Sequence, residues 1–487
     1  MIQLLITLFF GLLLAFFVLS GAINLLFFCG LVAFLIFLSR PLFSKVYLLL
    51  IATIVLFDKG VANQYFSLSK FGLNLHILDI MYLTIFIHFI FECLSKKIKC
   101  KWAPEYFFLY LFFLFVFISI FRPPYDLPLK SSFYAARELF YYGIPIVVFS
   151  ILDSHDKIKK LLDGLVLGTV MYSLLIISLY LVPNNPLAIF DPSQVSWAAS
   201  RIGFRNHQAY ILALPLCLVW ALSRKNPASQ RLMYGIYFSA GIFLIIIGQT
   251  RSLMIFSVIL LVLSNILIFN RRTILRPDFK APIFLGSFAL ISILMLFFIV
   301  GTPSHGILGP DLRQRFESFS QLGRDKSVKF REQQFEHDKV EMKKYFLFGQ
   351  GMRAFYKDAY QGRPLENIFF DNSNTLFIRK VGFVGYASLL LFIFFVSIKL
   401  YYCYRYSADF MAVSVSAAFL SIIPCAAINS FITAYLVQYK IIIVYSILFG
   451  VIQAMRELDL AKPSLSGKYT AGDTETMKRV AKDGSCD

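Results

Sequence analysis

The chain is poor in charged residues. Asp, Glu, Lys and Arg make up only 15% of its 487 residues, whereas 58% of the residues are hydrophobic. A soluble globular protein has about 25% charged and about 45–50% apolar residues. The composition therefore excludes an ordinary soluble domain and predicts an all-α membrane protein with many spans.

Cysteine and histidine are scarce as well, with 7 and 6 residues. No two cysteines have the C-x-x-C spacing and the histidines do not have the spacing of metal ligands, so neither a disulfide framework nor a metal site is predicted. The sequence also has no P-loop and no G-x-S-x-G motif. We therefore expect chemistry without ATP, metal or cofactor.

Long apolar runs fill most of the chain. About fourteen of them approach the roughly 20 residues that a helix needs to cross a bilayer, and 12–14 spans are expected. One polar stretch of about seventy residues, Gly301 to Asn372, interrupts them. The predicted helices are 2–19, 22–39, 45–57, 77–94, 104–121, 132–151, 161–182, 206–222, 232–248, 252–269, 281–300, 373–401, 410–428 and 430–452.

Basic residues are concentrated in alternate loops between these runs. Cytoplasmic loops are enriched in Lys and Arg, so these loops and both termini are predicted to be cytoplasmic, with the polar stretch outside. The pattern explains the net charge of +19 without nucleic acid as a partner. The clusters are Arg40, Lys45; Lys96, Lys97, Lys99, Lys101; Lys157, Lys159, Lys160; Arg224, Lys225, Arg231; Arg271, Arg272, Arg276, Lys280; Arg405; and Arg456, Lys462.

Four regions follow from this pattern. Residues 1–300 form spans with short loops, 301–372 form one large external loop, 373–455 form the last spans, and 456–487 form a disordered cytoplasmic tail. Within the loop, SVKFREQQFEHDKVEMKKYF has apolar residues near helical spacing and predicts an amphipathic helix. This helix either lies on the lipid interface or covers a site.

Four arginines are predicted beside turns at the outward ends of spans. Arginine keeps its charge and presents a planar fork that suits phosphate oxygens. Such a set fits a diphosphate whose lipid tail stays in the bilayer. Each arginine alone has the alternative of reaching lipid headgroups or forming a structural ion pair. The four are Arg201, Arg205, Arg251 and Arg353.

Two pairs of charged residues are predicted inside spans, where charge is unfavourable. Arg137 and Glu138 lie about a turn and a half from the outward end of their helix, and Arg379 and Lys380 either lie at a similar depth or mark a later start of their span. Glu138 and nearby helix ends are expected to neutralise Arg137.

Two polar motifs follow the predicted loop helix. In FLFGQGM, Gly349 and Gly351 permit a tight backbone path near a ligand. In FFDNSNTLF, the acid Asp371 and the amides Asn372 and Asn374 precede a long apolar helix. These polar residues either cap that helix or act on a substrate, with Asp371 accepting a proton and the amides holding sugar hydroxyls.

Five stretches together resemble the bacterial O-antigen ligase and O-antigen polymerase superfamily. They are LNLHILDIMYLTIF, SRIGFRNHQAYILALPL, TRSLMIFSVILLVLS, REQQFEHDKVEMKKYFLFGQGMRAF and DNSNTLFIRKVGFVGYASLLLFIF. Their order and loop placement matter more than any one motif. The matching residues are Asp79, Arg201, Gly203, Asn206, Arg251, Ser252, Gly349, Gly351, Asn374, Gly382 and Gly385.

The resemblance implies a metal-independent glycosyltransferase with a GT-C-like helical fold in the bacterial inner membrane. Its donor would be a glycan on undecaprenyl diphosphate at the periplasmic face. Implied partners besides membrane lipid are a chain-length regulator and a flippase. The implied catalytic residues are Asp371, Arg251 and Arg353. The implied binding residues are Arg201, Arg205, Asn206, Arg137, Gly349, Gly351, Asn372 and Asn374.

The chain departs from the ligase branch at one position. Where that branch has a histidine thought to activate the acceptor, this chain has Asp371, Asn372 and Ser373. The departure favours a polymerase, with a ligase that transfers polymer to lipid A-core as the alternative. A lipid-linked oligosaccharide flippase is the rival from another class, although the sequence shows no internal repeat of the kind that transporters often have. A non-catalytic assembly scaffold is a third possibility.

Overall fold

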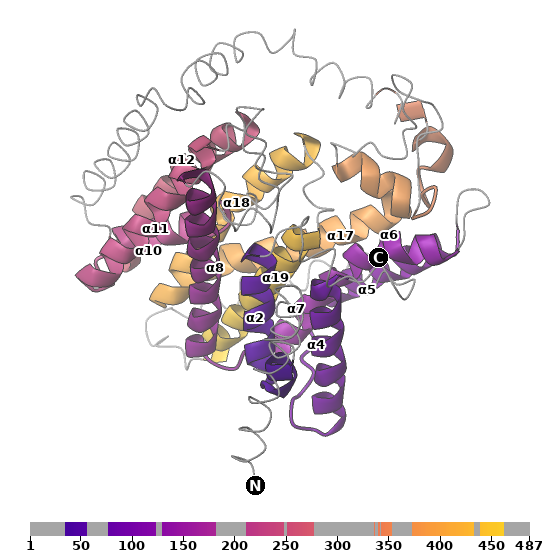
Figure 1. The fold of residues 1–487 in the computed structure, drawn as a ribbon, viewed down its shortest axis with the longest axis horizontal. Coiled ribbons are helices and arrows are strands. Elements are labelled where there is room, and N and C mark those ends of the chain that lie inside the picture. The colour runs from indigo at the N-terminus through magenta and orange to yellow at the C-terminus, as the bar shows by residue number, and fades with distance from the viewer. Residues whose placement is uncertain are drawn as a thin grey trace, which may run out of the picture.

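A computed structural model describes residues 35–55, 76–122, 129–181, 211–247, 251–276, 336, 339–340, 342–352, 373–432 and 439–461. In this part of the chain every regular element is a helix (Figure 1). The helices are α2 (Leu42–Val55), α4 (Ile77–Leu94), α5 (Tyr106–Ile120), α6 (Leu129–Phe140), η2 (Tyr141–Gly143), α7 (Ile144–Ile151), α8 (His155–Leu181), α10 (Leu214–Leu222), α11 (Ala228–Ile247), α12 (Arg251–Asn270), α13 (Arg272–Leu275), α17 (Ser373–Tyr406), α18 (Phe410–Ile432) and α19 (Tyr439–Ala461).

Within the described residues, four helices are long and apolar enough to cross a membrane. They include Ile77–Leu94, Ser373–Tyr406, Phe410–Ile428 and Lys440–Asp459, and shorter apolar helices lie beside them. Large apolar side chains also face outward, such as Phe107 on α5 and Phe394 on α17. Soluble proteins rarely expose wide apolar surfaces. The predicted all-α architecture is therefore confirmed in the described residues, with four helices able to cross a membrane. The predicted 12–14 spans and the GT-C-like fold stay predictions.

The centre of the bundle is formed by α17 and its neighbours. Helix α17 packs on α5, α18 and α19, while α8, α10, α11 and α12 form one side (Figure 1). Aromatic rings fill the contact between α17 and α5: the Phe112 and Phe377 rings meet edge to face, and Phe108 stacks on Phe395. Helix α5 is apolar on every face, as expected for a helix between protein and lipid.

Several predicted boundaries need correction. The span predicted at 132–151 consists of α6, η2 and α7, because Pro145 lacks the N–H that would continue regular helical bonding. The last span begins at Tyr439 and ends at Ala461, so its first described residue is nine later than predicted and its end extends into the predicted tail. Ser430 belongs to α18 instead. Helix α4 has the predicted bounds. The predicted spans 2–19 and 281–300, and most of 22–39, lie outside the described residues.

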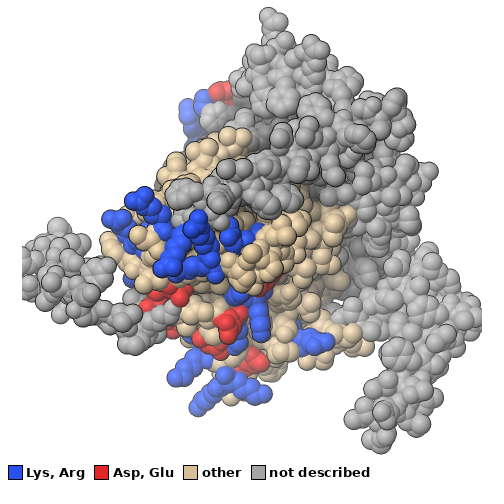
Figure 2. Space-filling model, turned by 90° about the vertical axis from the view of Figure 1, so that its left-hand side faces the viewer, with Lys and Arg blue, Asp and Glu red and all other residues tan. Residues whose placement is uncertain are grey.

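The predicted cytoplasmic loops meet one another at one end of the bundle. Lys101 lies 2.9 Å from Glu457, and the Arg271 guanidinium donates to the Ser407 carbonyl at 2.8 Å. The Arg224 amide donates to the Arg276 carbonyl at 3.1 Å. Figure 2 shows lysine and arginine side chains gathered on one face of the molecule. The alternation of charge thus identified loops that share an end, and the side of the membrane they face stays a prediction.

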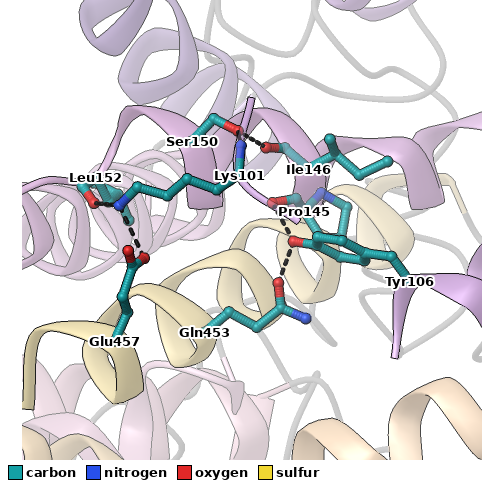
Figure 3. A network of polar contacts seen from close by, with 8 residues as sticks. All are labelled: Lys101, Tyr106, Pro145, Ile146, Ser150, Leu152, Gln453 and Glu457. Carbon is teal, nitrogen blue, oxygen red and sulfur yellow. Dashed lines mark hydrogen bonds and ion pairs between the residues drawn. The ribbon is translucent and has the colours of Figure 1, made fainter. Parts of the chain in front are cut away.

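Polar contacts join α5, α7 and α19 just inside this end (Figure 3). The Tyr106 hydroxyl donates to the Pro145 carbonyl at 3.1 Å and to Gln453. Gln453 donates in turn to the buried carboxylate of Glu105 at 3.0 Å, and Lys399 of α17 pairs with that carboxylate. Helices α5, α7, α17 and α19 are therefore joined by hydrogen bonds and an ion pair. If these helices separated, lipid could not offer the polar groups new partners.

Candidate functional site

The proposed phosphate and acceptor residues lie mostly outside the described residues. Arg251 is the first residue of α12, and the structure describes its backbone but not its side chain. Those of which the structure describes nothing are Arg201, Arg205, Asn206, Arg353, Asp371 and Asn372. The candidate residues that it does describe, Arg137, Gly349, Gly351 and Asn374, all lie at the end of the bundle opposite the basic loops.

The G-x-G turn and a break in α17 form one unit, which we call the loop–helix junction (Phe346–Met352 with Arg379–Val384). Gly349 and Gly351 have φ values of 71° and 115°, as the predicted tight turn requires. Gly382 interrupts α17 with φ 79° and ψ 169°. A Cβ on Gly349 would stand 2.5 Å from the Gly382 nitrogen. Only glycines allow the two backbones to approach this closely.

Backbone hydrogen bonds hold the junction together. The amides of Phe383 and Val384 begin the second half of α17, and they donate to the carbonyls of Phe346 and Leu347 at 2.7 and 3.3 Å. The Gln350 amide donates to the Arg379 carbonyl at 2.6 Å. A broken helix at membrane depth needs such partners, because lipid offers none. The end of the large loop therefore completes α17.

Side chains reinforce the junction. The Arg379 guanidinium, 1% exposed, donates to the Gln350 side-chain oxygen at 3.0 Å. The Met352 amide donates to the Ser119 carbonyl at the end of α5, 3.2 Å away. The Phe348 ring stacks on Phe115. The turn is therefore fixed to α5 as well as to α17.

Arg137 forms an ion pair with a residue far away in sequence. Its guanidinium lies 3.5 Å from the carboxylate of Asp79, in the first turn of α4. That carboxylate also accepts from the Tyr141 hydroxyl and, at 2.7 Å, from the His76 amide. Asp79 thus orients Arg137 and caps the start of α4.

The charge of Glu138 lies close enough to Lys380 of α17 for the two to attract. The described ion pair of Arg137 is with the Asp79 carboxylate. The N-terminal end of α4 carries a partial positive charge, so the attraction there comes from that carboxylate and not from the helix end. The expectation that Glu138 neutralises Arg137 stays a prediction.

Asn374 lies in the first turn of α17. Its side-chain oxygen accepts from the Tyr386 hydroxyl, one turn beyond the break, and from Ser430 of α18 at 3.3 Å. Asn374 thus connects the two halves of α17 to α18. Helix capping, the alternative predicted for the DNSN motif, stays a prediction.

These residues give one end of the bundle a set of amides, hydroxyls and arginines from α4, α6, α17, α18 and the large loop. Such groups can bind phosphate and sugar oxygens. Among the described residues, no group of His, Cys, Asp and Glu side chains gathers as metal ligands would. Sequence reasoning missed Gln350, Tyr386 and Ser430, which bear no motif signal of their own. Arg379 was a visible signal, since a charge within an apolar span needs a reason.

Comparison of the sequence with protein-family models and with curated proteins finds no match. The class that the fold defines is a helical protein with helices able to cross a membrane.

Proposed function

We propose that this chain is a membrane glycosyltransferase that polymerises undecaprenyl-diphosphate-linked repeat units at the periplasmic face of the bacterial inner membrane. The supporting observation is the loop–helix junction, which attaches the only long polar segment of the sequence to α17 beside Asn374 and Arg379. An enzyme acting on a lipid-linked glycan needs this combination of a polar loop and a membrane-embedded wall.

The proposed catalytic residues Arg353 and Asp371 lie close in sequence to residues that the structure describes. Arg353 follows Met352 directly, whose amide is bonded to Ser119. Asp371 precedes Ser373, the first residue of α17, by two positions. Arg353 is therefore one residue from the junction in sequence, and Asp371 is two residues from the start of α17. Arg251 begins α12, a neighbour of α18.

In the proposed reaction, an acceptor hydroxyl attacks the anomeric carbon of the donor glycan. The bond from that carbon to the diphosphate oxygen breaks, and undecaprenyl diphosphate leaves with the electron pair. Asp371 takes the hydroxyl proton. Arg201, Arg205, Arg251 and Arg353 stabilise the negative charge that grows on the diphosphate.

Arg137, Asn206, Asn372 and Asn374 are proposed to bind the glycan or the diphosphate, with Gly349 and Gly351 shaping the backbone near them. The acceptor is a second lipid-linked repeat unit. The proposed partners are a chain-length regulator and a flippase that supplies the donor.

Substitution of Arg251 and Arg353 by Ala, singly and together, tests the proposal in the native host. We expect single-repeat glycan in place of long polymer, with normal amounts of protein in the membrane. Arg405→Ala, an exposed arginine at the other end of α17, is the matched control. Long polymer in the double variant refutes the arginine clamp. In a strain that lacks the protein, polymer accumulating on the carrier lipid and absent from lipid A indicates a ligase, and unchanged glycan indicates neither enzyme.

A further inference from the structure

A cavity of about 270 Å³ lies between α17, α18 and α19, directly beside the candidate site. It extends along α17 from Asn374 to Leu400. Beyond the break at Gly382, the lining on α17 runs from Tyr386 to Leu400, about 21 Å of helix, and the hydrocarbon core of a bilayer is about 30 Å thick. The cavity is therefore an elongated groove along α17 that is shorter than the hydrocarbon core is thick.

The lining has a polar end and an apolar body. At one end lie Asn374, Tyr386 and Ser430, which are hydrogen-bonded to one another. The body is lined by aliphatic and aromatic side chains such as Ile393 and Phe449, and the described lining contains no charged residue. A charged group has no partner inside this groove, whereas a hydrocarbon chain fits its surface.

Small residues of α18 create the space. Ala426 and Ala427 line the groove within one turn after Pro424, where a larger side chain would fill it. Ala427 is exposed and Leu390, on the facing helix, is 42% exposed. The groove is therefore open sideways, and in a membrane this opening faces lipid.

We infer that the groove between α17, α18 and α19 holds one segment of the polyprenyl chain of the carrier lipid, with the diphosphate beyond its Asn374 end. This inference rests on the proposed function, because the carrier is its substrate. Small-molecule pockets measure about 300–1,000 Å³, so this one suits a single slender chain and not a whole lipid. The polar end places the head of that chain next to the junction.

The groove orients the polyprenyl chain and contributes little to its binding free energy. Lipid tails are as apolar as the groove, so moving a chain from the bilayer into it yields little hydrophobic free energy. Contact with the aromatic walls and the grip on the diphosphate hold the chain in place. The sideways opening lets the carrier enter from the bilayer without leaving it.

The test is photo-crosslinking of the full-length protein in phosphatidylcholine nanodiscs, using undecaprenyl phosphate that bears a diazirine in its chain. We expect labelled peptides from the groove faces of α17 and α18, and competition by unlabelled undecaprenyl phosphate. Ala427→Trp should lower the labelling about tenfold because the indole overfills the groove. Ile428→Trp is the matched control: Ile428 is the next residue, 50% exposed and outside the lining, so its labelling should be unchanged.

Labelling confined to other helices overturns the inference, as does equal labelling of the groove by a diazirine phosphatidylcholine probe. Unchanged labelling of a folded Ala427→Trp protein overturns it too. If that variant fails to reach the membrane, Ala427→Leu tests the same position with a smaller side chain. The two proposals separate cleanly. Specific labelling with normal polymer in the Arg251→Ala, Arg353→Ala strain supports the groove and refutes the arginine clamp, and the reverse result does the opposite.

Discussion

Gly349 and Gly382 come from opposite sides of the large loop's attachment, yet their backbones touch. A Cβ on Gly382 would lie 2.5 Å from the Phe348 Cα, and both glycines have positive φ. At both positions, therefore, the backbone conformation and the lack of space for a Cβ each require glycine. The junction is the best-defined part of the candidate site and leads to the first prediction.

Gly382→Ala should lower the free energy of unfolding by at least about 1–3 kcal/mol, the range for a strained backbone. The clash with the Phe348 backbone adds to this, because backbone cannot turn aside. Thermal unfolding of the purified protein in detergent measures the effect. Gly168→Ala is the control: its new Cβ meets the end of the Ile54 side chain at 3.0 Å, which can rotate away. Equal stability of the two variants contradicts the described junction.

Asp79→Asn and Arg137→Met should be less than additive when combined. The two side chains are 11% and 22% exposed, so each charge left alone is poorly solvated. We expect a coupling free energy of about 0.5–3 kcal/mol in a double-mutant cycle. The exposed pair of Asp153 and Lys157 is the control, with an expected coupling of about 0.3–0.5 kcal/mol. A zero coupling for the first pair would show that no ion pair exists.

Glu105→Gln should destabilise the bundle by about 2–3 kcal/mol. Breaking a buried ion pair costs about 3–5 kcal/mol, and the 28% exposure of Lys399 places this case below that range. The double change Glu105→Leu, Lys399→Leu should be less harmful than Glu105→Gln, since it leaves no charge alone. Melting temperatures of the three proteins check the order. A double variant that is the least stable refutes this account.

Cysteine labelling tests the predicted orientation. Cys100 is exposed in a basic loop, and Leu347 is exposed at the opposite end of the bundle. In a background without other cysteines, Cys100 should react with a membrane-impermeant maleimide only after the cells are opened. Leu347→Cys should react in intact cells. The opposite result reverses the topology and removes the periplasmic site.

Helix positions were predictable from the sequence where apolar runs were uninterrupted, as in α4. They were less so where the chain kinks. Gly382 is followed by an apolar run, and glycine is compatible with a straight helix there, so the charged pair Arg379 and Lys380 was the only local signal near the break in α17. At Pro145 the signal was local, because proline lacks the N–H of a regular helix, although the span stays nearly helical through η2. At Gly382 the contacts with the large loop decide the geometry.

The sequence predicted individual residues of the candidate site, but it did not predict which of them contact one another. The sequence indicated that Gly349 and Gly351 turn tightly, and their positive φ values confirm it. It could not show that Asp79 would meet Arg137, because 58 residues separate them and only the packing of α4 beside α6 and η2 joins them. Likewise Gln350 acquires its role only through its position next to Arg379.

The loop and α17 are joined chiefly through main-chain groups, and this has a consequence for how related sequences can drift. Amides and carbonyls exist at every position, so the residues at 346, 347, 383 and 384 can change identity freely without loss of the hydrogen bonds. Insertions or deletions between the paired segments and their glycines cannot be absorbed in this way. Homologues should therefore vary in composition here while they preserve the two glycine spacings.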